Sequence, residues 1–182
     1  MSHRDTVLRR IDPATSKVTA KIDTGVLGCG DLVAGAGSIW VTGCGATPGL
    51  VRVDPRRARV QDSARTTGLG PAFHDGELWV GAPAAGGGEE LRRAHPDRLD
   101  EARAVPVAGL IEANGVVSSG GSVWVSDKTS AVVYRVDPAT STVLAAIPIA
   151  LDPNDGYLLE HDGDGDGGQH RGRRRIHPVH HG

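Results

Sequence analysis

Aromatic side chains are scarce in this chain of 182 residues, where Phe, Trp and Tyr together make up 3%. A hydrophobic core therefore has to be built from Val, Ile, Leu and Ala, with three tryptophans as its largest members. Neither sign of charge dominates, because the formal net charge is −2. This balance gives no electrostatic reason to expect nucleic acid or an acidic membrane surface as a partner.

Cysteines and long apolar runs are also few. Two cysteines, Cys29 and Cys44, cannot form a disulfide framework. They could meet across a hairpin, but in a reducing compartment we expect two small buried thiols. No apolar run approaches the ~20 residues of a membrane helix. The first residues also lack the apolar stretch of a secretory signal, so a cytoplasmic location is the default expectation.

What the chain does contain is a repeated phrase. The segment "RRIDPATSKV" near the start returns as "YRVDPATSTV", with "VRVDPRRARV" between them and degenerate copies at "RRAHPDRLDE" and "RRIHPVHHG". A second marker, "GSIWV", "GELWV" and "GSVWV", runs in step with the first. The spacing is about 42 residues, which indicates an internal repeat. The markers are Asp12, Pro13, Asp54, Pro55, Asp137 and Pro138 for the first phrase and Trp40, Trp79 and Trp124 for the second.

Each repeat has the pattern of short strands and tight turns. β-Branched and aromatic runs are bounded by glycines or by Asp-Pro pairs. Proline presets the backbone of a turn, and an aspartate before it can accept backbone N–H groups just beyond, so we interpret these aspartates as turn residues rather than ligands. One tryptophan per repeat favours packing between sheets over a substrate platform. No stretch of ten or more residues has helical apolar spacing without glycine or proline.

Four short strands every ~40–45 residues is the spacing of a β-propeller blade. We predict an all-β propeller segment over residues 1–155, with a partial blade at 7–25 and four-stranded antiparallel blades at about 31–66, 71–108 and 114–150. Residues 156–182 are expected to be a degenerate or disordered tail. Residues 7–25 could pair with strands from "GYLLEHD" onward and close a four-bladed ring, or the chain could form an incomplete arc. We favour the arc, because "HDGDGDGGQHRGRRR" is a poor strand former.

The segments "RIDPATSKVTAKIDTG" and "GSIWV" resemble the repeats of the YVTN and virginiamycin-B-lyase-like propeller family, over about residues 7–150. Because that family usually has six to eight blades, the resemblance implies a fragment of a larger bacterial propeller protein. We expect a disturbed reading frame after about Asp155, where the marker phase continues but the apolar alternation is lost. Repeats with this sequence pattern often form the sensor or binding portions of larger proteins. The resemblance therefore implies a non-catalytic module that binds an unknown protein or small molecule.

The alternative function comes from the same resemblance. Virginiamycin B lyases open a streptogramin lactone by elimination, with a histidine base and Mg²⁺ held by acidic residues. Their blades typically read "WFTE", whereas this chain has "WVTG", "WVGA" and "WVSD". The resemblance therefore carries over no catalytic residue, and Mg²⁺ is implied only if the chain is a lyase.

Two segments near the end contain residue types that bind metal ions. "DGDGDG" matches the first half of a calcium loop, but Arg173 occupies the position that needs a bidentate glutamate. Histidines of "HPVHHG" have spacings that can chelate zinc or nickel. The candidate ligands are Asp162, Asp164 and Asp166 in the first segment and His177, His180 and His181 in the second. Both segments are more simply interpreted as solvated and flexible, so we expect no metal and no cofactor.

Nucleophilic catalysis also lacks a recognisable motif. No Gly-x-Ser-x-Gly segment is present. His74 is followed by Asp75, but we expect adjacent side chains on a turn to point apart.

Overall fold

The computed structural model describes residues 5–44, 49–64 and 70–149, without the side chains of residues 29, 30 and 44. These residues form fourteen β-strands in four antiparallel sheets. Sheet I contains two strands, and sheets II, III and IV contain four strands each in sequence order. This is the strand order of propeller blades. The described residues include no helix of the length and apolar character that crossing a membrane requires.

The strands follow one another along the chain. Sheet I is formed by β1 (Val7–Asp12) and β2 (Lys17–Asp23). Sheet II is formed by β3 (Leu27–Gly35), β4 (Ser38–Cys44), β5 (Gly49–Asp54) and β6 (Arg59–Ala64). Sheet III is formed by β7 (Ala72–His74), β8 (Glu77–Pro83), β9 (Glu89–His95) and β10 (Arg98–Val105). Sheet IV is formed by β11 (Ala113–Ser119), β12 (Ser122–Asp127), β13 (Val132–Asp137) and β14 (Thr142–Pro148).

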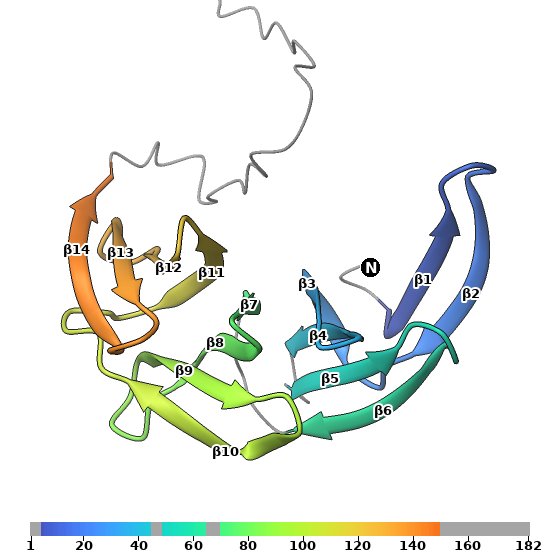
Figure 1. Cartoon of the computed structure of the whole chain (residues 1–182), viewed down its shortest axis with the longest axis horizontal. Coiled ribbons are helices and arrows are strands. Elements are labelled where there is room, and N and C mark those ends of the chain that lie inside the picture. Colours follow the sequence, from blue (N-terminus) through green and yellow to red (C-terminus); the bar gives the residue numbers. More distant parts are fainter. Residues whose placement is uncertain (1–4, 45–48, 65–69, 150–182) are drawn as a thin grey trace, which may run out of the picture.

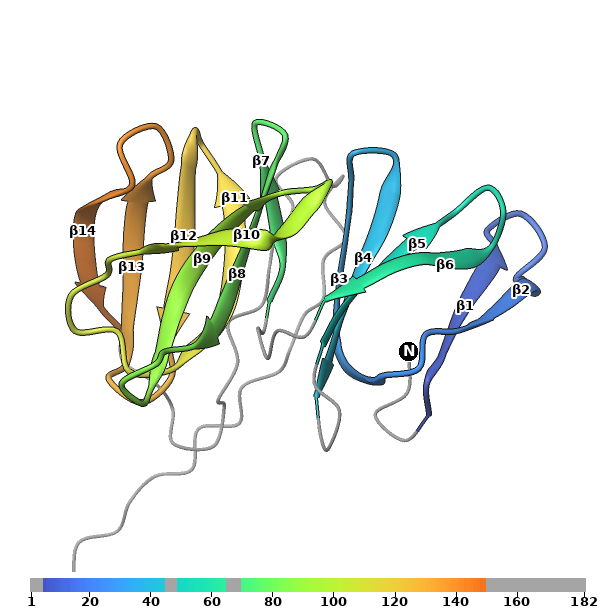
Figure 2. The same ribbon diagram turned by 90° about the horizontal axis from the view of Figure 1, so that it is seen from below.

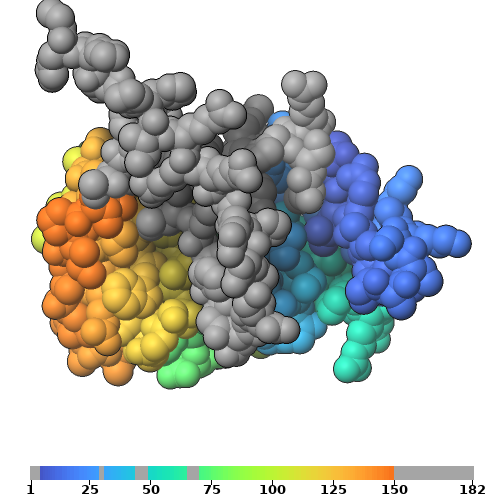
Figure 3. Space-filling model, turned by 90° about the horizontal axis from the view of Figure 1, so that it is seen from above, coloured from blue at the N-terminus to red at the C-terminus, as the bar shows by residue number. Residues whose placement is uncertain are grey.

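The four sheets stand side by side around an open arc (Figure 1). In sheets II, III and IV, the innermost strands are β3, β7 and β11, and the outermost are β6, β10 and β14 (Figure 1). Figure 2 shows each of these sheets twisting from its inner to its outer strand. Sheet I and sheet IV lie at opposite ends of the arc, blue and orange in Figure 3. The described sheets therefore do not close into a ring.

The glycine before each tryptophan strand is explained by the turn that precedes it. The first hairpin of each four-stranded sheet turns at two residues with positive φ, which is the type I′ geometry whose twist suits a hairpin. The pairs are Ala36 and Gly37 (φ 48° and 68°), Asp75 and Gly76 (46° and 81°), and Gly120 and Gly121 (57° and 68°). Glycine adopts such angles without steric cost, so the second position is glycine in all three.

The tryptophans fill the space between one sheet and the next. Trp40 and Trp79 are 0% exposed. Trp40 belongs to a cluster with Leu78 of sheet III, and Trp79 belongs to a cluster with Val116 of sheet IV. Trp124 of sheet IV is only half-buried, because no further sheet follows it among the described residues.

The predicted fold class is confirmed. The described residues are all-β, the complete blades are four-stranded and antiparallel, and the sheets form an incomplete propeller. Ring closure through strands from "GYLLEHD" onward concerns residues outside those that the structure describes. The same holds for the expected tail at residues 156–182 and for the side chains of Cys29 and Cys44.

Candidate functional site

Each four-stranded sheet places an arginine beside its tryptophan. The register between the second and third strands sets the two residues opposite each other in all three sheets. The guanidinium group then lies over the indole ring, which is a cation–π contact. The distance from the arginine Cζ to the centre of the ring is 5.2 Å for Arg52 over Trp40, 5.8 Å for Arg93 over Trp79 and 5.5 Å for Arg135 over Trp124.

The same arginine position joins one sheet to the next. In sheets I, II and III, its Nη1 donates a hydrogen bond to the carbonyl oxygen of the turn proline in the following sheet. We call this contact the latch. The three latches are Arg10 to Pro55 (3.1 Å), Arg52 to Pro96 (3.3 Å) and Arg93 to Pro138 (3.0 Å). This role was not predicted from the sequence, although each of these arginines lies two residues before the Asp or His of the repeated phrase.

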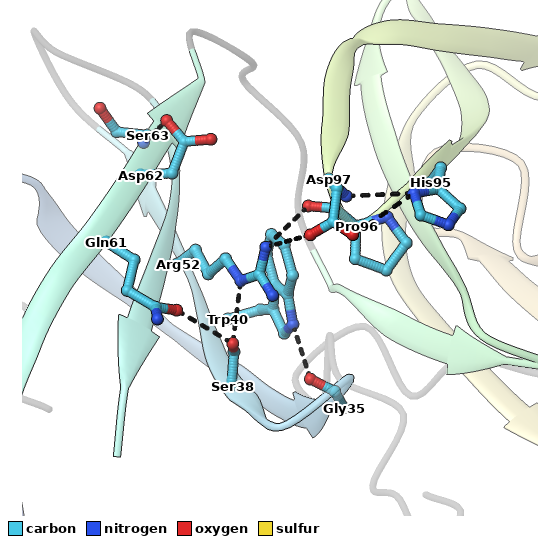
Figure 4. A network of polar contacts seen from close by, with 10 residues as sticks. All are labelled: Gly35, Ser38, Trp40, Arg52, Gln61, Asp62, Ser63, His95, Pro96 and Asp97. Carbon is cyan, nitrogen blue, oxygen red and sulfur yellow. Dashed lines mark hydrogen bonds and ion pairs between the residues drawn. The ribbon is translucent and has the colours of Figure 1, made fainter. Parts of the chain in front are cut away.

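The latch between sheets II and III is reinforced by an ion pair (Figure 4). Arg52 Nη1 lies 2.6 Å from Asp97 Oδ1, and Arg52 Nε donates to Ser38 Oγ at 2.9 Å. Ser38 Oγ in turn donates to the side chain of Gln61 on β6 at 3.2 Å. The hydrogen bond from Arg52 lowers the pKa of Asp97 from its ordinary value. Asp97 therefore stays ionised near neutral pH and fixes the Arg52 side chain.

A groove of about 450 Å³ opens beside this network, between the outer parts of sheets II and III. Its apolar lining is Leu50, Leu78, Val80 and Leu99, and its small residues are Ala64, Ala94 and Ala102. Its polar lining is Asp62, Ser63, Arg92, Asp97 and Asp100. Arg92 is paired with Glu90 at 2.6 Å, so its charge is already balanced. Asp62 and Asp100 are exposed and have no ion pair with another described residue.

The groove therefore combines an apolar floor with a surplus of negative charge at its edge. Leu50 and Leu78 are 2% and 0% exposed, so they form its floor rather than its rim. Three carboxylates stand around this floor on β6, on β10 and on the turn before β10. Such a surface suits an apolar group that carries positive charge beside it.

A second cluster joins the inner strands of sheets III and IV. His74 Nδ1 lies 2.8 Å from Ser118 Oγ. On the other side of the ring, His74 Nε2 lies 3.5 Å from Asp75 Oδ2, so the prediction that these adjacent side chains point apart is wrong. The reason is the positive φ of Asp75, which turns its carboxylate back toward the imidazole. Asp75 is 92% exposed, and the cluster acts as a cross-sheet contact at the surface.

A third cluster contains three carboxylates from sheets III and IV and the segment before β11. Burial raises the pKa of Glu89, and the nearby charges of Glu112 and Asp127 raise it further. Burial also acts to raise the pKa of Asp127, but backbone donors such as Ile111 N (2.7 Å) prevail and lower it. Among the described residues, no group of three His, Cys, Asp or Glu side chains is arranged to hold a metal ion.

The Asp-Pro markers lie at hairpin turns with side-chain hydrogen bonds. Asp12 accepts from Ala14 N at 2.9 Å and from Thr15 Oγ1 at 2.8 Å. The equivalent turn residues Asp54 and Asp137 accept backbone N–H groups in the same way. These hydrogen bonds lower the pKa of all three carboxyl groups.

In the degenerate repeat, His95 replaces the turn aspartate. Its Nδ1 accepts a hydrogen bond from Asp97 N at 3.2 Å, so histidine supplies the same acceptor. The proline markers lie at the same turns. The carbonyl oxygens of Pro55 and Pro138 accept latch hydrogen bonds, and Pro13 is exposed. The candidate metal ligands Asp162, Asp164, Asp166, His177, His180 and His181 lie outside the described residues.

Comparisons with known proteins identify the fold. No protein-family model and no curated sequence matches the chain. The nidogen/laminin complex matches with a TM-score of 0.57 and 16% identity, over 73% of this chain and 51% of that one. Hydrazine synthase of Kuenenia stuttgartiensis matches with a TM-score of 0.64 and 15% identity, over 79% of this chain and 43% of that one. Virginiamycin B lyase from Staphylococcus aureus matches with a TM-score of 0.45 and 11% identity, over 82% of this chain and 65% of that one.

The first two of these structures are β-propeller proteins, which supports the propeller fold and no particular family. The chain spans about half or less of the length of the first two. Sequence identities of this size are evidence for the fold alone, and the similarity to the lyase is too weak to support an argument about activity.

Proposed function

We propose that this chain is a non-catalytic propeller module that binds a protein segment in the groove between sheets II and III. The segment would place an apolar side chain on the floor formed by Leu50 and Leu78, against Leu99 at the wall. Lysine or arginine beside it would meet Asp62 and Asp100. The single observation that supports this function is the apolar groove with two carboxylates at its edge, Asp62 and Asp100, that form no ion pair with another described residue.

The position of the groove favours a protein segment over an enclosed small molecule. Its carboxylates are exposed on the outer strands, where an extended chain can pass along the surface. The nidogen/laminin structure, which has the same fold, is itself a complex between proteins. Exposed charge pairs of this kind contribute more to the rate and selectivity of binding than to affinity.

Fluorescence anisotropy with two labelled peptides tests the proposal. One peptide has a central leucine flanked by lysines, and the other has the same leucine flanked by glutamates. We expect the lysine peptide to bind and the glutamate peptide to bind at least about tenfold more weakly. Equal binding of the two peptides, or no binding of either, would contradict the proposal.

Adjacent residues of β10 provide a matched pair of variants. Asp100 lines the groove, whereas Glu101 is exposed and does not. Asp100→Lys should weaken binding of the lysine peptide about tenfold, and Glu101→Lys should leave it unchanged, although both change the net charge equally. If both variants weaken binding to the same extent, the attraction is a general effect of charge and the groove is not the site.

The lyase alternative has a separate test. Mg²⁺-dependent loss of a streptogramin B lactone, followed by absorbance with the purified full chain, would show a catalytic activity. We expect no turnover above the rate with Mg²⁺ alone. Measurable turnover would overturn the non-catalytic part of the proposal, while the peptide experiment would still decide whether the groove binds.

A further inference from the structure

Sheet IV is the last described sheet, and its strand β13 contains Arg135 at the latch position. Among the described residues, Arg135 has no hydrogen-bond acceptor in another sheet. Arg135 lies over Trp124 at 5.5 Å. Its Nε donates to Ser122 Oγ at 2.9 Å, which repeats the contact between Arg52 and Ser38 in sheet II. The side chain is thus held by the same two contacts, to a tryptophan ring and to a serine, that hold the latch Arg52.

The same face of sheet IV presents apolar groups. Val133 and Arg135 are two residues apart on β13 and share a face, and Val133 pairs with Ile147 on β14. Ile147 is 41% exposed, and Trp124 is half-buried. At the other junctions, this face of a sheet is covered by its neighbour.

Sheet I presents the complementary end. Leu8 and Arg10 face sheet II, since Leu8 packs against its core and Arg10 forms a latch. Because side chains alternate along a strand, Ile11 faces the other way, and it is 57% exposed. The equivalent residues Val53 and Val136, which face a preceding sheet, are both 0% exposed.

The turn of sheet I has the form of a latch acceptor. It has the same hydrogen bond from a residue after the proline to the aspartate that the other Asp-Pro turns have. Pro13 is exposed, whereas the latch acceptor Pro96 is buried. Among the described residues, the arc therefore has an arginine without a latch acceptor at one end and a turn carbonyl without a latch donor at the other.

We propose that two copies of this chain associate head to tail. Arg135 of each copy donates to the Pro13 carbonyl of the other, and the Ile147 face of sheet IV covers the Ile11 face of sheet I. The contact repeats three latches that already exist within the chain, so it needs no new kind of interaction. Two such contacts related by a two-fold axis close the assembly.

The shape of the arc favours a second copy over closure within one chain. Sheets I and IV lie at opposite ends of the described part of the molecule (Figures 1 and 3), and the arc of sheets is open on the side between them (Figure 1). Bringing them together would require the packed junctions between the sheets to bend. The described residues of each chain supply three four-stranded sheets and the two-stranded sheet I. Two copies would thus supply eight sheets, two of them two-stranded, and propellers adopt ~4–8 blades.

Sedimentation velocity of the full chain over a range of concentrations tests the proposal, with circular dichroism to check folding. We expect a species of twice the 18.9 kDa mass of one chain. Arg135→Ala should weaken dimerisation at least about tenfold, because a desolvated charged hydrogen bond is lost. Arg103→Ala, an exposed arginine on the outer strand of sheet III, is the control and should leave the dimer unchanged.

A second variant is designed to strengthen the contact. Asp97 directly follows the acceptor Pro96 and forms an ion pair with the latch Arg52. Ala14 is exposed at the equivalent position after Pro13. Ala14→Asp should therefore tighten the dimer severalfold, and the gain should disappear in combination with Arg135→Ala.

Three outcomes would overturn the proposal. The first is a monomer at all concentrations, which would include a chain whose sheet IV face is covered by its own residues 150–182. The second is a dimer that Arg135→Ala leaves intact while circular dichroism shows a folded protein. The third is an Ala14→Asp gain that persists without Arg135.

Discussion

The junction between sheets II and III and the junction between sheets III and IV come from the same repeat but are packed differently. Three buried residues, Trp40, Leu50 and Leu78, form the cluster between sheets II and III. The cluster between sheets III and IV contains ten buried residues, including Trp79 and Leu91. The looser junction contains the groove, lined in part by the small residues Ala64 and Ala102. Fewer and smaller side chains between sheets II and III thus leave a groove open to solvent, although the repeats themselves are regular.

The two junctions also shift the pKa of a carboxyl group in opposite directions. At the looser junction, Asp97 is exposed and paired with Arg52, which lowers its pKa. At the tighter junction, Glu89 is partly buried near Glu112, and burial raises its pKa. Glu89 Oε2 has no hydrogen-bond partner among the described residues. The open junction tolerates charge that the closed junction makes costly.

Truncating one leucine at each junction should separate them most clearly. Leu91 is 0% exposed in the tighter cluster, whereas Leu99 is half-buried at the wall of the groove. Leu91→Ala should lower the free energy of unfolding by about 3 kcal/mol, because it leaves a closed cavity. Leu99→Ala should lower it by only about 1 kcal/mol, because that site is already open to water. Urea unfolding at pH 7 measures both, and equal costs would show that the junctions are packed alike.

Replacing the two buried tryptophans by phenylalanine should give the next largest difference. Trp40 Nε1 donates to the Gly35 carbonyl at 3.1 Å, whereas Trp79 Nε1 has no hydrogen-bond partner among the described residues. Trp40→Phe leaves the Gly35 carbonyl without the indole donor, whereas Trp79→Phe removes a buried N–H that forms no hydrogen bond with a described residue. We expect Trp40→Phe to cost about 1 kcal/mol more in urea unfolding. A larger cost for Trp79→Phe would mean that its N–H is satisfied in solution.

The fold could be predicted because its determinants are local and repeated. Gly37 and Gly121 mark turns that need positive φ, and the tryptophans mark the second strand of each blade, so their phase indicates successive sheets. The latch also has a local signal, an arginine two residues before the turn aspartate, as in Arg10 and Asp12. It was missed because its acceptor lies in the next sheet, about one repeat further along the chain.

The groove could not be predicted in this way. Its lining includes Ala64 of β6 and Ala102 of β10, two positions that no short motif connects. The pairing of β10 with β9 is also irregular between Arg98 and Arg103, so simple alternation does not tell which side chains of β10 reach the groove. The contact between His74 and Asp75 was mispredicted for a related reason, since it depends on the φ of Asp75.

Removing the charge of Asp97 should have a smaller effect, confined to the looser junction. The lowered pKa of Asp97 means that its stabilising contribution is present above its ordinary value of 3.8 and is lost as the pH falls below it. Asp97→Asn should therefore lower stability slightly at pH 7, and the difference from the native chain should vanish in acid and shrink in high salt. Asp62→Asn is the control, because Asp62 lines the same groove and forms no ion pair with another described residue. A loss that is independent of pH would contradict the ion pair.

The smallest effect should come from Glu89 at the tighter junction, and it should have the opposite sign. Because burial raises the pKa of Glu89 above its ordinary value of 4.5, ionisation costs stability as the pH rises through the raised value. Glu89→Gln removes that cost while keeping an oxygen for the Ala113 N–H. Thermal unfolding should show a slightly more stable variant at pH 7 and no difference below pH 4.5, where the native carboxyl is protonated. If Glu89→Gln instead destabilises the chain at pH 7 as Asp97→Asn does, the carboxylate has a cationic partner in solution and the two junctions do not differ in how they treat charge.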